Sequence, residues 1–455
     1  MKHLIFLIAL LISHQVLAQV PSLDMIYGPV TTPGDCRYNN CFSQSELVEK
    51  TNQNSFENRD GLLALFETRQ NIKVRVGQLL PSFNLRIDNV FNVFDYIPNL
   101  IGFIFPSNWY RLKESKLHAK AQEFSFVSTN ANQRNAASGL FLIAHQEEIN
   151  SRIIFNHLNY AQELLELMEL RYEYGEVAYE DIEEMNAFIA FMHSDYVIQQ
   201  SLTQQLLLEI AYLVDDVQLS LPSAPVEIKL PDFKSMNQVS PEDLLKPILE
   251  ASPELKSLEY LALATQYSKK SRVYDFLTPD NGTESALGFG TAANLRISQS
   301  EIERIEIKKD MFRADITKSL ISISRDIKNA SELNKDAYNI EKSLRYILAS
   351  LIKDFETSSK IDINRFISLL SDNLRAQFLR NNSAHAYLVS KENLDRLLLT
   401  SANYQSISER IPTDTTKLDC YLRKENRKIQ KAINSGTLKL PETIEFNDDD
   451  LTFCF

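Results

Sequence analysis

The sequence predicts a mainly α-helical protein with a small β part, built from two tandem repeats of a strand pair followed by a long antiparallel coiled-coil helical hairpin. Glycine is scarce, at 11 of 455 residues, and no proline occurs between Pro106 and Pro222 or between Pro279 and Pro412. Because proline inside a helix costs about 3 kcal/mol, both tracts allow very long helices. Within them apolar residues recur at alternating spacings of four and three, which is the seam of a coiled coil.

Residues 1–18 predict a secretory signal peptide that is removed in the mature chain. Lys2 and His3 precede an apolar run from Leu4 to Ile12, and Ala18 offers a cleavage site before Gln19. The apolar run is too short for a transmembrane helix, and no later window has about 20 consecutive apolar residues. We therefore expect no membrane helix. The cleavage point is not followed by cysteine, which argues against a lipid anchor, and membrane insertion would have to use strands.

Residues 19–41 are expected to form an N-terminal tail that carries two of the four cysteines. An exported chain can form disulfides. The short spacing of Cys36 and Cys41 predicts a local bridge, and Cys420 and Cys454 are the candidates for a second. Four cysteines allow three connectivities, which the sequence leaves open. Free or mixed thiols are the alternative.

The first repeat covers residues 42–238 and has its strand pair at about 80–106. From Ser82 to Asp88 apolar and polar side chains alternate strictly. This is the pattern of a membrane-barrel strand and equally of any half-buried strand. A returning strand is expected from Leu100 to Phe105, with aromatic residues on both sides of it.

The helical hairpin of the first repeat is expected at about 108–220. Tyr174-Gly175-Glu176-Val177 interrupts the apolar rhythm, so that a helix of about 65 residues turns back into one of about 40. At 1.5 Å per residue the longer arm would reach roughly 90 to 100 Å. The seam residues are Ile154, Leu158, Ala161, Leu165, Met168 and Tyr172 before the turn, and Ile182, Met185, Ile189, Met192 and Tyr196 after it.

The second repeat covers residues 239–404, with strands at about 273–297 and a hairpin at about 298–403. Alternation returns from Gly288 to Ser298, while its partner around Val273 to Pro279 is weak and short. The apolar rhythm also returns, with more interruptions than in the first hairpin. Its residues are Ile316, Leu320, Ile323, Ile327 and Ala330, followed by Leu344, Leu348, Leu351 and Phe355.

Matches at similar offsets indicate that the two repeats arose by duplication. A shift of 198 positions places Leu79-Leu80-Pro81 on Leu277-Thr278-Pro279, and a shift of 184 places Gly175 on Ser359. The second turn is therefore expected at Thr357-Ser358-Ser359-Lys360, without a glycine. A tandem repeat of this length indicates one supersecondary unit used twice.

The composition argues against several functional classes. With 48 basic and 60 acidic residues the net charge is -12, the wrong sign for a general nucleic-acid binder. The histidines show no metal-ligand spacing and no neighbouring nucleophile motif, so we expect no enzyme, no metal and no cofactor. Residues 405–455 form a C-terminal extension with charged runs that are expected to be solvated, and the alternative for the basic stretch from Arg423 to Lys431 is a helix that contacts lipid headgroups or cell wall. The five histidines of the mature chain, each expected on a helix surface, are His118, His145, His157, His193 and His385.

Three motifs, in this order of elements, carry a resemblance to a known family. They are Leu79-Leu80-Pro81-Ser82 at the start of the strands, Tyr174 with Asp181 at the hairpin turn, and Ser252-Pro253-Glu254-Leu255 at the start of the second repeat. Over roughly 42–403 the chain resembles the outer-membrane efflux protein family, of which TolC is a member.

That resemblance implies a homotrimer in the outer membrane that projects into the periplasm. Each chain would give four strands to a shared 12-stranded β-barrel, because four strands cannot close a barrel alone and open edges are not tolerated in lipid. The helices would form an α-helical barrel. Its implied role is the exit duct of tripartite efflux or type I secretion, a passive conduit opened by a periplasmic adaptor protein and an inner-membrane pump.

The resemblance also assigns adaptor contacts to the hairpin turns. These residues are Tyr174, Gly175, Glu176 and Val177 in the first repeat and Ser358, Ser359, Lys360 and Ile361 in the second. Some family members narrow the entrance with aspartates, at positions where this chain has Arg365 and Ser368. We therefore hypothesise a gate of mixed charge, in which Arg365 pairs with Asp362, Asp181 or Glu184 across helices and each pair is worth about 0 to 1 kcal/mol. Its residues would be Asp181, Glu184, Asp362 and Arg365.

A periplasmic coiled-coil scaffold or adaptor that never forms a pore is the competing interpretation. Adaptors also use long helical hairpins. They usually carry one hairpin per chain between sheet-rich domains, which this sequence lacks. The transported substrate cannot be read from the sequence, because the tunnel of such a channel is wide and selection would lie with the pump.

Overall fold

The computed structural model describes residues 20–27, 41–80, 102–214, 224–274, 289–357 and 362–399. The chain divides into two compact units, each assembled from segments that are distant in the sequence. Unit 1 comprises residues 1–51, 135–244 and 319–394, and unit 2 comprises residues 52–134, 245–318 and 395–455.

The described secondary structure is almost entirely helical, and its helices recur in the same order. The first series is α4 (Phe56–Leu79, 24 residues), α6 (Pro106–Glu173, 68 residues) and α7 (Tyr179–Leu213, 35 residues). The second is α9 (Pro253–Tyr274, 22 residues), α10 (Phe289–Thr357, 69 residues) and α11 (Ile363–Leu398, 36 residues). Such nearly equal lengths are what a duplicated unit would give. The shorter helices are α2 (Asp24–Tyr27), α3 (Gln44–Asn54), η2 (Gly102–Ile104), η3 (Phe233–Ser235) and α8 (Pro241–Ala251).

Proline marks the beginnings of these helices. Pro106, Pro241 and Pro253 each occupy the first helical position of α6, α8 and α9. At this position the missing N–H would have no partner within the helix and the fixed φ is already helical. The interiors of α6, α7, α10 and α11 contain no proline, and so nothing interrupts their backbone hydrogen bonds.

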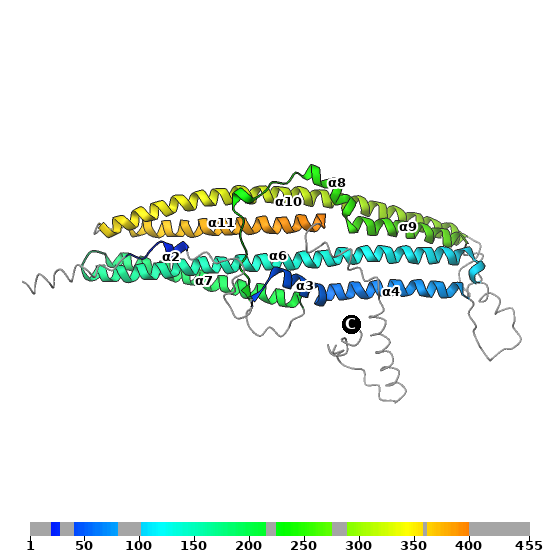
Figure 1. The fold of residues 1–455 in the computed structure, drawn as a ribbon, viewed down its shortest axis with the longest axis horizontal. Helices are drawn as coiled ribbons and strands as arrows, with labels where there is room; N and C mark the ends of the chain where they lie inside the picture. Colours follow the sequence, from blue (N-terminus) through cyan, green and yellow to red (C-terminus); the bar gives the residue numbers. More distant parts are fainter. Residues whose placement is uncertain are drawn as a thin grey trace, which may run out of the picture. The chain divides into compact units, whose positions relative to one another are not determined.

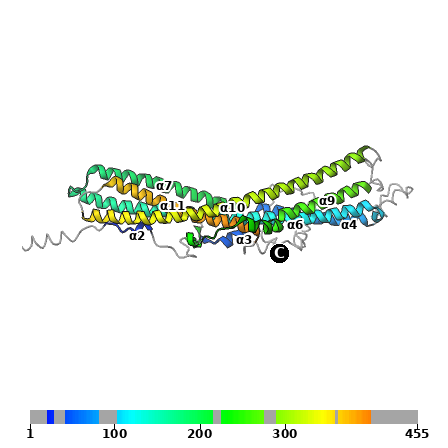
Figure 2. The ribbon, with the colours of Figure 1, turned by 90° about the horizontal axis from the view of Figure 1, so that it is seen from above.

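Unit 1 contains the hairpin ends of the long helices. There α6 turns back into α7 and α10 is followed by α11, each pair lying side by side (Figures 1 and 2). Met168, Met185, Leu348 and Leu370 lie in one buried cluster that draws on all four helices. Burial of one such side chain stabilises by about 1.5–3 kcal/mol. Most seam residues expected from the sequence are buried, whereas Tyr172, close to the first turn, is exposed.

Unit 2 contains α4, α9 and the first parts of α6 and α10. The ring of Phe124 on α6 stacks on Tyr260 of α9, with centroids 5.5 Å apart. Arg69 of α4 pairs with Glu123 of α6 at 3.0 Å. Aromatic stacking and partly shielded ion pairs thus supplement the apolar contacts in this unit.

A short parallel pair of strands connects two distant segments of unit 1. β1 (Cys41–Phe42) pairs with β2 (Ala224–Pro225), and Cys41 lies opposite Ala224. It is the only sheet within the described ranges, and the sequence did not predict it. Cys41 is disulfide-bonded to a residue outside those ranges, so its pairing with Cys36 stays a prediction.

The described parts of the predicted membrane strands are helical. Residues 289–298 belong to α10, Val273 belongs to α9, and Gly102–Ile104 form η2. Over residues 289–298 the prediction of a strand was wrong. Over so short a run, alternation also fits a helix, and alanine, leucine and arginine here favour one. Residues 81–101 and 275–288, which hold the rest of the predicted strands, lie outside the described residues, as do the signal peptide and the C-terminal extension. None of the described helices is apolar and long enough to cross a membrane.

Candidate functional site at the hairpin turns

The first hairpin turn is closed by backbone hydrogen bonds around a single glycine. Gly175 has a φ of 72°, a left-handed conformation that glycine adopts without steric cost. Its N–H donates to Tyr172 O at 2.9 Å, and the N–H of Glu176 donates to Arg171 O at 3.0 Å. This is the Schellman arrangement, in which the last carbonyls of a helix find donors beyond its end. The sequence therefore ends α6 sharply and reverses the chain.

An aspartate of the hypothesised gate caps the next helix. The Asp181 carboxylate accepts the N–H of Ala178, the residue before α7, at 3.4 Å. Acidic side chains are favourable at a helix N-terminus, because they complement its dipole and its free N–H groups. Glu184 lies one turn further along α7 and is exposed. Asp181 therefore has a structural role here, and its role in a gate remains a hypothesis.

Tyrosine side chains protrude around this turn. Tyr174 is 82% exposed. The rings of Tyr172 and Tyr179 lie 6.0 Å apart on the two helices that meet there. Val177, by contrast, packs against the buried cluster of unit 1. The turn thus presents amphipathic rings to its surroundings while one side chain anchors it.

Of the second turn, the structure describes the first residues of α11. The Asp362 carboxylate accepts the backbone N–H of Arg365 at 3.1 Å, and its carbonyl accepts the N–H of Phe366 at 3.1 Å. Asp362 is thus the cap of α11. Within the described part of the chain, the Arg365 side chain forms no ion pair with Asp362, Asp181 or Glu184, and the hydrogen bond to Asp362 comes from the Arg365 backbone. Ser358–Ile361 lie outside the described residues.

An arginine that the sequence did not single out connects the two hairpins beside the turns. Arg171, in the last turn of α6, donates through Nη1 to Phe355 O of α10 at 2.8 Å. Its guanidinium lies 4.0 Å from the centre of the Phe355 ring, and its Nε lies 3.9 Å from Glu176. A planar guanidinium can stack and donate at once, which a lysine cannot. The spacing of the seam gave no signal for this contact, because its partners are 184 residues apart.

A second group of residues that sequence reasoning misplaced is buried deeper in unit 1. His145, His157 and His385 are about 1% exposed or less, so their expected place on a helix surface was wrong. His193 is exposed, as expected. His157 donates from Nδ1 to Ile153 O at 2.9 Å. Burial lowers its pKa to about 4, because a charged ring loses hydration there.

The other two buried histidines are hydrogen-bonded to each other. His385 donates from Nδ1 to Asn381 O at 3.0 Å, so its Nε2 can accept from His145 Nδ1, 2.8 Å away. The N–H of Ile228 then donates to His145 Nε2 at 3.3 Å. Each ring nitrogen of the two histidines therefore has a polar partner within 3.3 Å. Burial lowers the pKa of His385 to about 3.

A carboxylate and an arginine complete this polar cluster. Glu227 lies 3.4 Å from His145 Nε2 and pairs with Arg152. Burial alone would raise the pKa of Glu227, but its contacts with His145 and Arg152 outweigh that effect and lower the pKa to about 2. The described residues contain no group of three or more side chains placed to hold a metal ion. The cluster joins α6, α11 and the segment at 227–228 through hydrogen bonds and an ion pair in the interior of unit 1.

Solved structures share this fold. The chain aligns with the outer membrane channel CmeC from Campylobacter jejuni at a TM-score of 0.63 and 12% identity, covering 81% of this chain and 89% of that one. The fold is that of the TolC-like outer-membrane channels. A membrane protein from Pseudomonas aeruginosa gives 0.65 at 12% identity, with 81% and 99% covered, and VceC from Vibrio cholerae gives 0.61 at 10% identity, with 78% and 96% covered.

Sequence comparison does not detect this relationship. No family model and no curated protein matches the chain. The likeness to the solved structures is therefore one of fold, at sequence identities of 10% to 12%.

Proposed function

We propose that this chain is a passive channel of the outer membrane that works as the exit duct of a tripartite efflux or type I secretion system. The observation that carries the proposal is the fold. The chain with its two tandem hairpins aligns with an outer membrane channel over 89% of that chain and with a second membrane protein over 99% of its length. A single-hairpin adaptor would not match them over both repeats. One of the solved structures that share the fold is an outer membrane channel, which favours a conduit over an enzyme.

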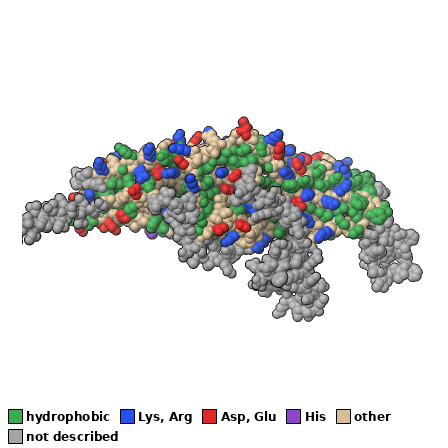
Figure 3. Space-filling view, in the orientation of Figure 1, with side chains coloured by type: hydrophobic (Ala, Val, Ile, Leu, Met, Phe, Trp, Pro, Cys, Tyr) green, Lys and Arg blue, Asp and Glu red, His purple; other side chains and the backbone are tan. Residues whose placement is uncertain are grey.

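Exposed apolar side chains on α7 support self-association. Phe191, Ile198 and Tyr212 are 74%, 57% and 70% exposed. They are separated by multiples of seven residues and therefore lie near one face of the helix. Apolar patches also reach the surface among charged side chains of both signs on the face drawn in Figure 3. Large apolar side chains that are exposed on one face of a helix indicate an interface, and we infer that this face of α7 is covered by other copies in a homotrimer.

The turns are the proposed contacts for a periplasmic adaptor protein, through which an inner-membrane pump would act. Tyr174 and its neighbours offer exposed rings, and tyrosine is enriched at protein interfaces because it buries much area at little entropic cost. The gate of Asp181, Glu184, Asp362 and Arg365 would then lie among residues that also cap helices. Outer-membrane lipid is the remaining proposed partner.

Fractionation of cells that express the full chain tests this proposal. We expect outer-membrane protein that migrates as a trimer without heating and as a monomer after heating, and that conducts ions in planar bilayers. A soluble periplasmic monomer without conductance would instead support the scaffold interpretation. Chains with Tyr174→Ala should still trimerise and conduct but lose cross-linking to an adaptor, whereas Ser194→Ala, at an exposed site on α7, should retain it.

A further inference from the structure

The segment Val20–Tyr27, expected to be part of a free tail, packs against both hairpins of unit 1. Ile26 is 1% exposed and belongs to the same apolar cluster as Tyr160 of α6 and Leu348 of α10. Burying one isoleucine side chain stabilises by about 1.5–3 kcal/mol. This free energy of burial is larger than a chance contact between a tail and the protein surface would give.

Polar contacts fix the segment in one register. Asn373 of α11 donates to the Tyr27 hydroxyl at 2.8 Å. Arg345 of α10 lies 4.3 Å from the centre of the Tyr27 ring and pairs with Asp24 at 3.2 Å. Burial of the hydroxyl raises the pKa of Tyr27, although the bond from Asn373 opposes this. One tyrosine thus contacts both helices of the second hairpin.

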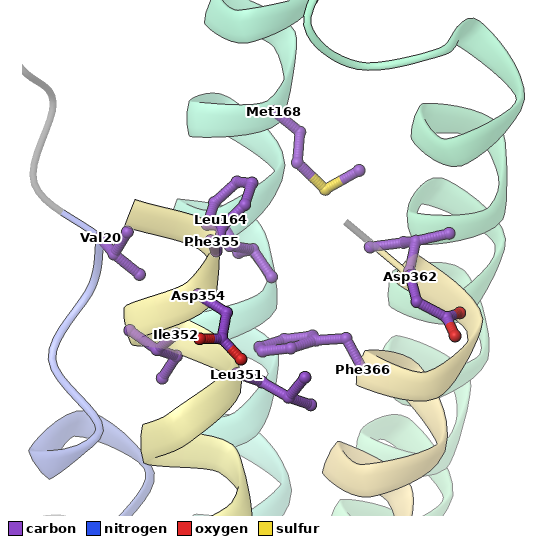
Figure 4. A pocket seen from close by; sticks show the side chains of 10 residues that line it. Val20, Leu164, Met168, Leu351, Ile352, Asp354, Phe355, Asp362 and Phe366 are labelled. Carbon is purple, nitrogen blue, oxygen red and sulfur yellow. The ribbon is translucent and has the colours of Figure 1, made fainter. Parts of the chain in front are cut away.

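The start of the segment reaches the hairpin turns. Val20 lines a cavity of about 50 Å³ together with Met168 of α6, Phe355 of α10 and Phe366 of α11 (Figure 4). Phe355 is the residue on which Arg171 stacks. The segment therefore lies beside the contact that joins the two hairpins at their ends.

The segment is held weakly enough to be released. Its only helix, α2, has 4 residues, and isolated helices shorter than about 12 residues are marginal in water. Its order thus depends on the hairpins it contacts. Conversely, separating the hairpins would remove the partners of Ile26 on α6 or on α10, so docking of the segment and closure of the hairpins favour each other.

We propose that Val20–Tyr27 is a clasp that holds the two hairpins together beside their turns, and that its release favours the widened tip of the channel. Its role in widening rests on the proposed channel function. Docking of the clasp does not depend on the channel function, and it is measured separately.

Hydrogen–deuterium exchange of the full chain in detergent tests the docking. Ile26→Asp places a charge in the apolar cluster, and Ile26→Val is the matched control that keeps the site apolar. We expect the amides at 348–355 and 363–370 to exchange about tenfold faster or more in Ile26→Asp than in Ile26→Val. Tyr27→Phe keeps the ring and leaves Asn373 without its acceptor, and it should accelerate the same amides about tenfold.

Conductance in planar bilayers tests the coupling. We expect Ile26→Asp and Tyr27→Phe to raise the mean ion conductance above that of Ile26→Val. Unchanged exchange in both variants would overturn the clasp even if the channels conduct normally. Faster exchange with unchanged conductance would overturn its role in widening. If none of the proteins conducts ions, the channel function fails, while the exchange data still decide whether the clasp docks.

Discussion

Acid is expected to destabilise unit 1 through two buried histidines at a higher pH than that at which the contribution of Glu227 is lost. His157 and His385 have pKa values of about 4 and about 3 in the fold, against 6.5 in the unfolded chain. A lowered histidine pKa means that the unfolded chain takes up the proton first. The stability that these two neutral histidines contribute is therefore fully present above about pH 6.5 and is lost progressively as the pH falls below that value.

The size of the effect follows from the two pKa values. At pH 5 each histidine has removed roughly 2 kcal/mol from the free energy of unfolding, and the two together roughly 4 kcal/mol. Glu227 has its pKa lowered to about 2, so its contribution is present above pH 4.5 and is lost only below that value. Between pH 6.5 and pH 5 the titration of Glu227 therefore does not add to the loss of stability that the two histidines cause.

Urea unfolding followed by circular dichroism at pH 7.5 and at pH 5.0 measures the effect. In His385→Asn the difference between the two pH values should shrink by roughly 2 kcal/mol, because one proton fewer distinguishes the two states. His193→Gln removes an exposed histidine of α7 and should leave the difference as in the wild type. An equal difference in His385→Asn and the wild type would refute the argument from burial.

Three further predictions concern the turns and the proposed interface. Gly175→Ala should lower the free energy of unfolding by about 1–2 kcal/mol, because residue 175 has a left-handed backbone. Gly139 lies inside α6 with space for an added methyl, so Gly139→Ala should raise the free energy of unfolding by about 0.5–1 kcal/mol. Thermal melts of the two variants should shift in opposite directions. Arg171→Lys should cost about 1–2 kcal/mol by the same assay, because a lysine cannot both stack on the Phe355 ring and donate to the Phe355 carbonyl as the guanidinium does. An unchanged melt would show that the contact adds no stability. Phe191→Asp should convert trimer to monomer in light scattering, and Ser194→Asp, at an exposed site three residues away, should not.

The long helices could be predicted because their signals are local and repeated. The proline-free tracts and the seam residues such as Met168 and Leu348 recur over many turns, and a coiled coil needs little else. Gly175 marked the first turn for a similar reason, since a glycine interrupts the seam there. The strand prediction at Gly288–Ser298 relied on about ten residues of alternation, too short a window to separate the two periodicities.

The contacts between hairpins could not be predicted, because their partners are distant in the sequence. The residues beside Arg171 in the sequence give no signal of its contact, because its partner Phe355 is brought to it only by the fold. The buried histidines carried a signal that was overlooked. His385 continues a series of polar residues four apart on α11, and in a helix that spacing places them on one face. The other members are Asn373, Gln377 and Asn381, all of them buried.

This polar series of α11 indicates which part of the second hairpin can move. Asn381 donates to Asn150 of α6 at 2.8 Å, and His385 lies 2.8 Å from His145. If α11 slid along α6 by one heptad, these groups would lose their partners, and each buried polar group left unpaired costs about 1–3 kcal/mol.

Closer to the turn the contacts of α11 have a different character. Phe366 and Leu370 pack there through apolar surface, which has no directional requirement. We therefore expect the hairpins to separate by bending near the turns, beside Val20–Tyr27, while the register set by the polar series is kept. Cysteine cross-links near Asn381 should leave ion conductance unchanged, and cross-links between the clasp and α11 should suppress it.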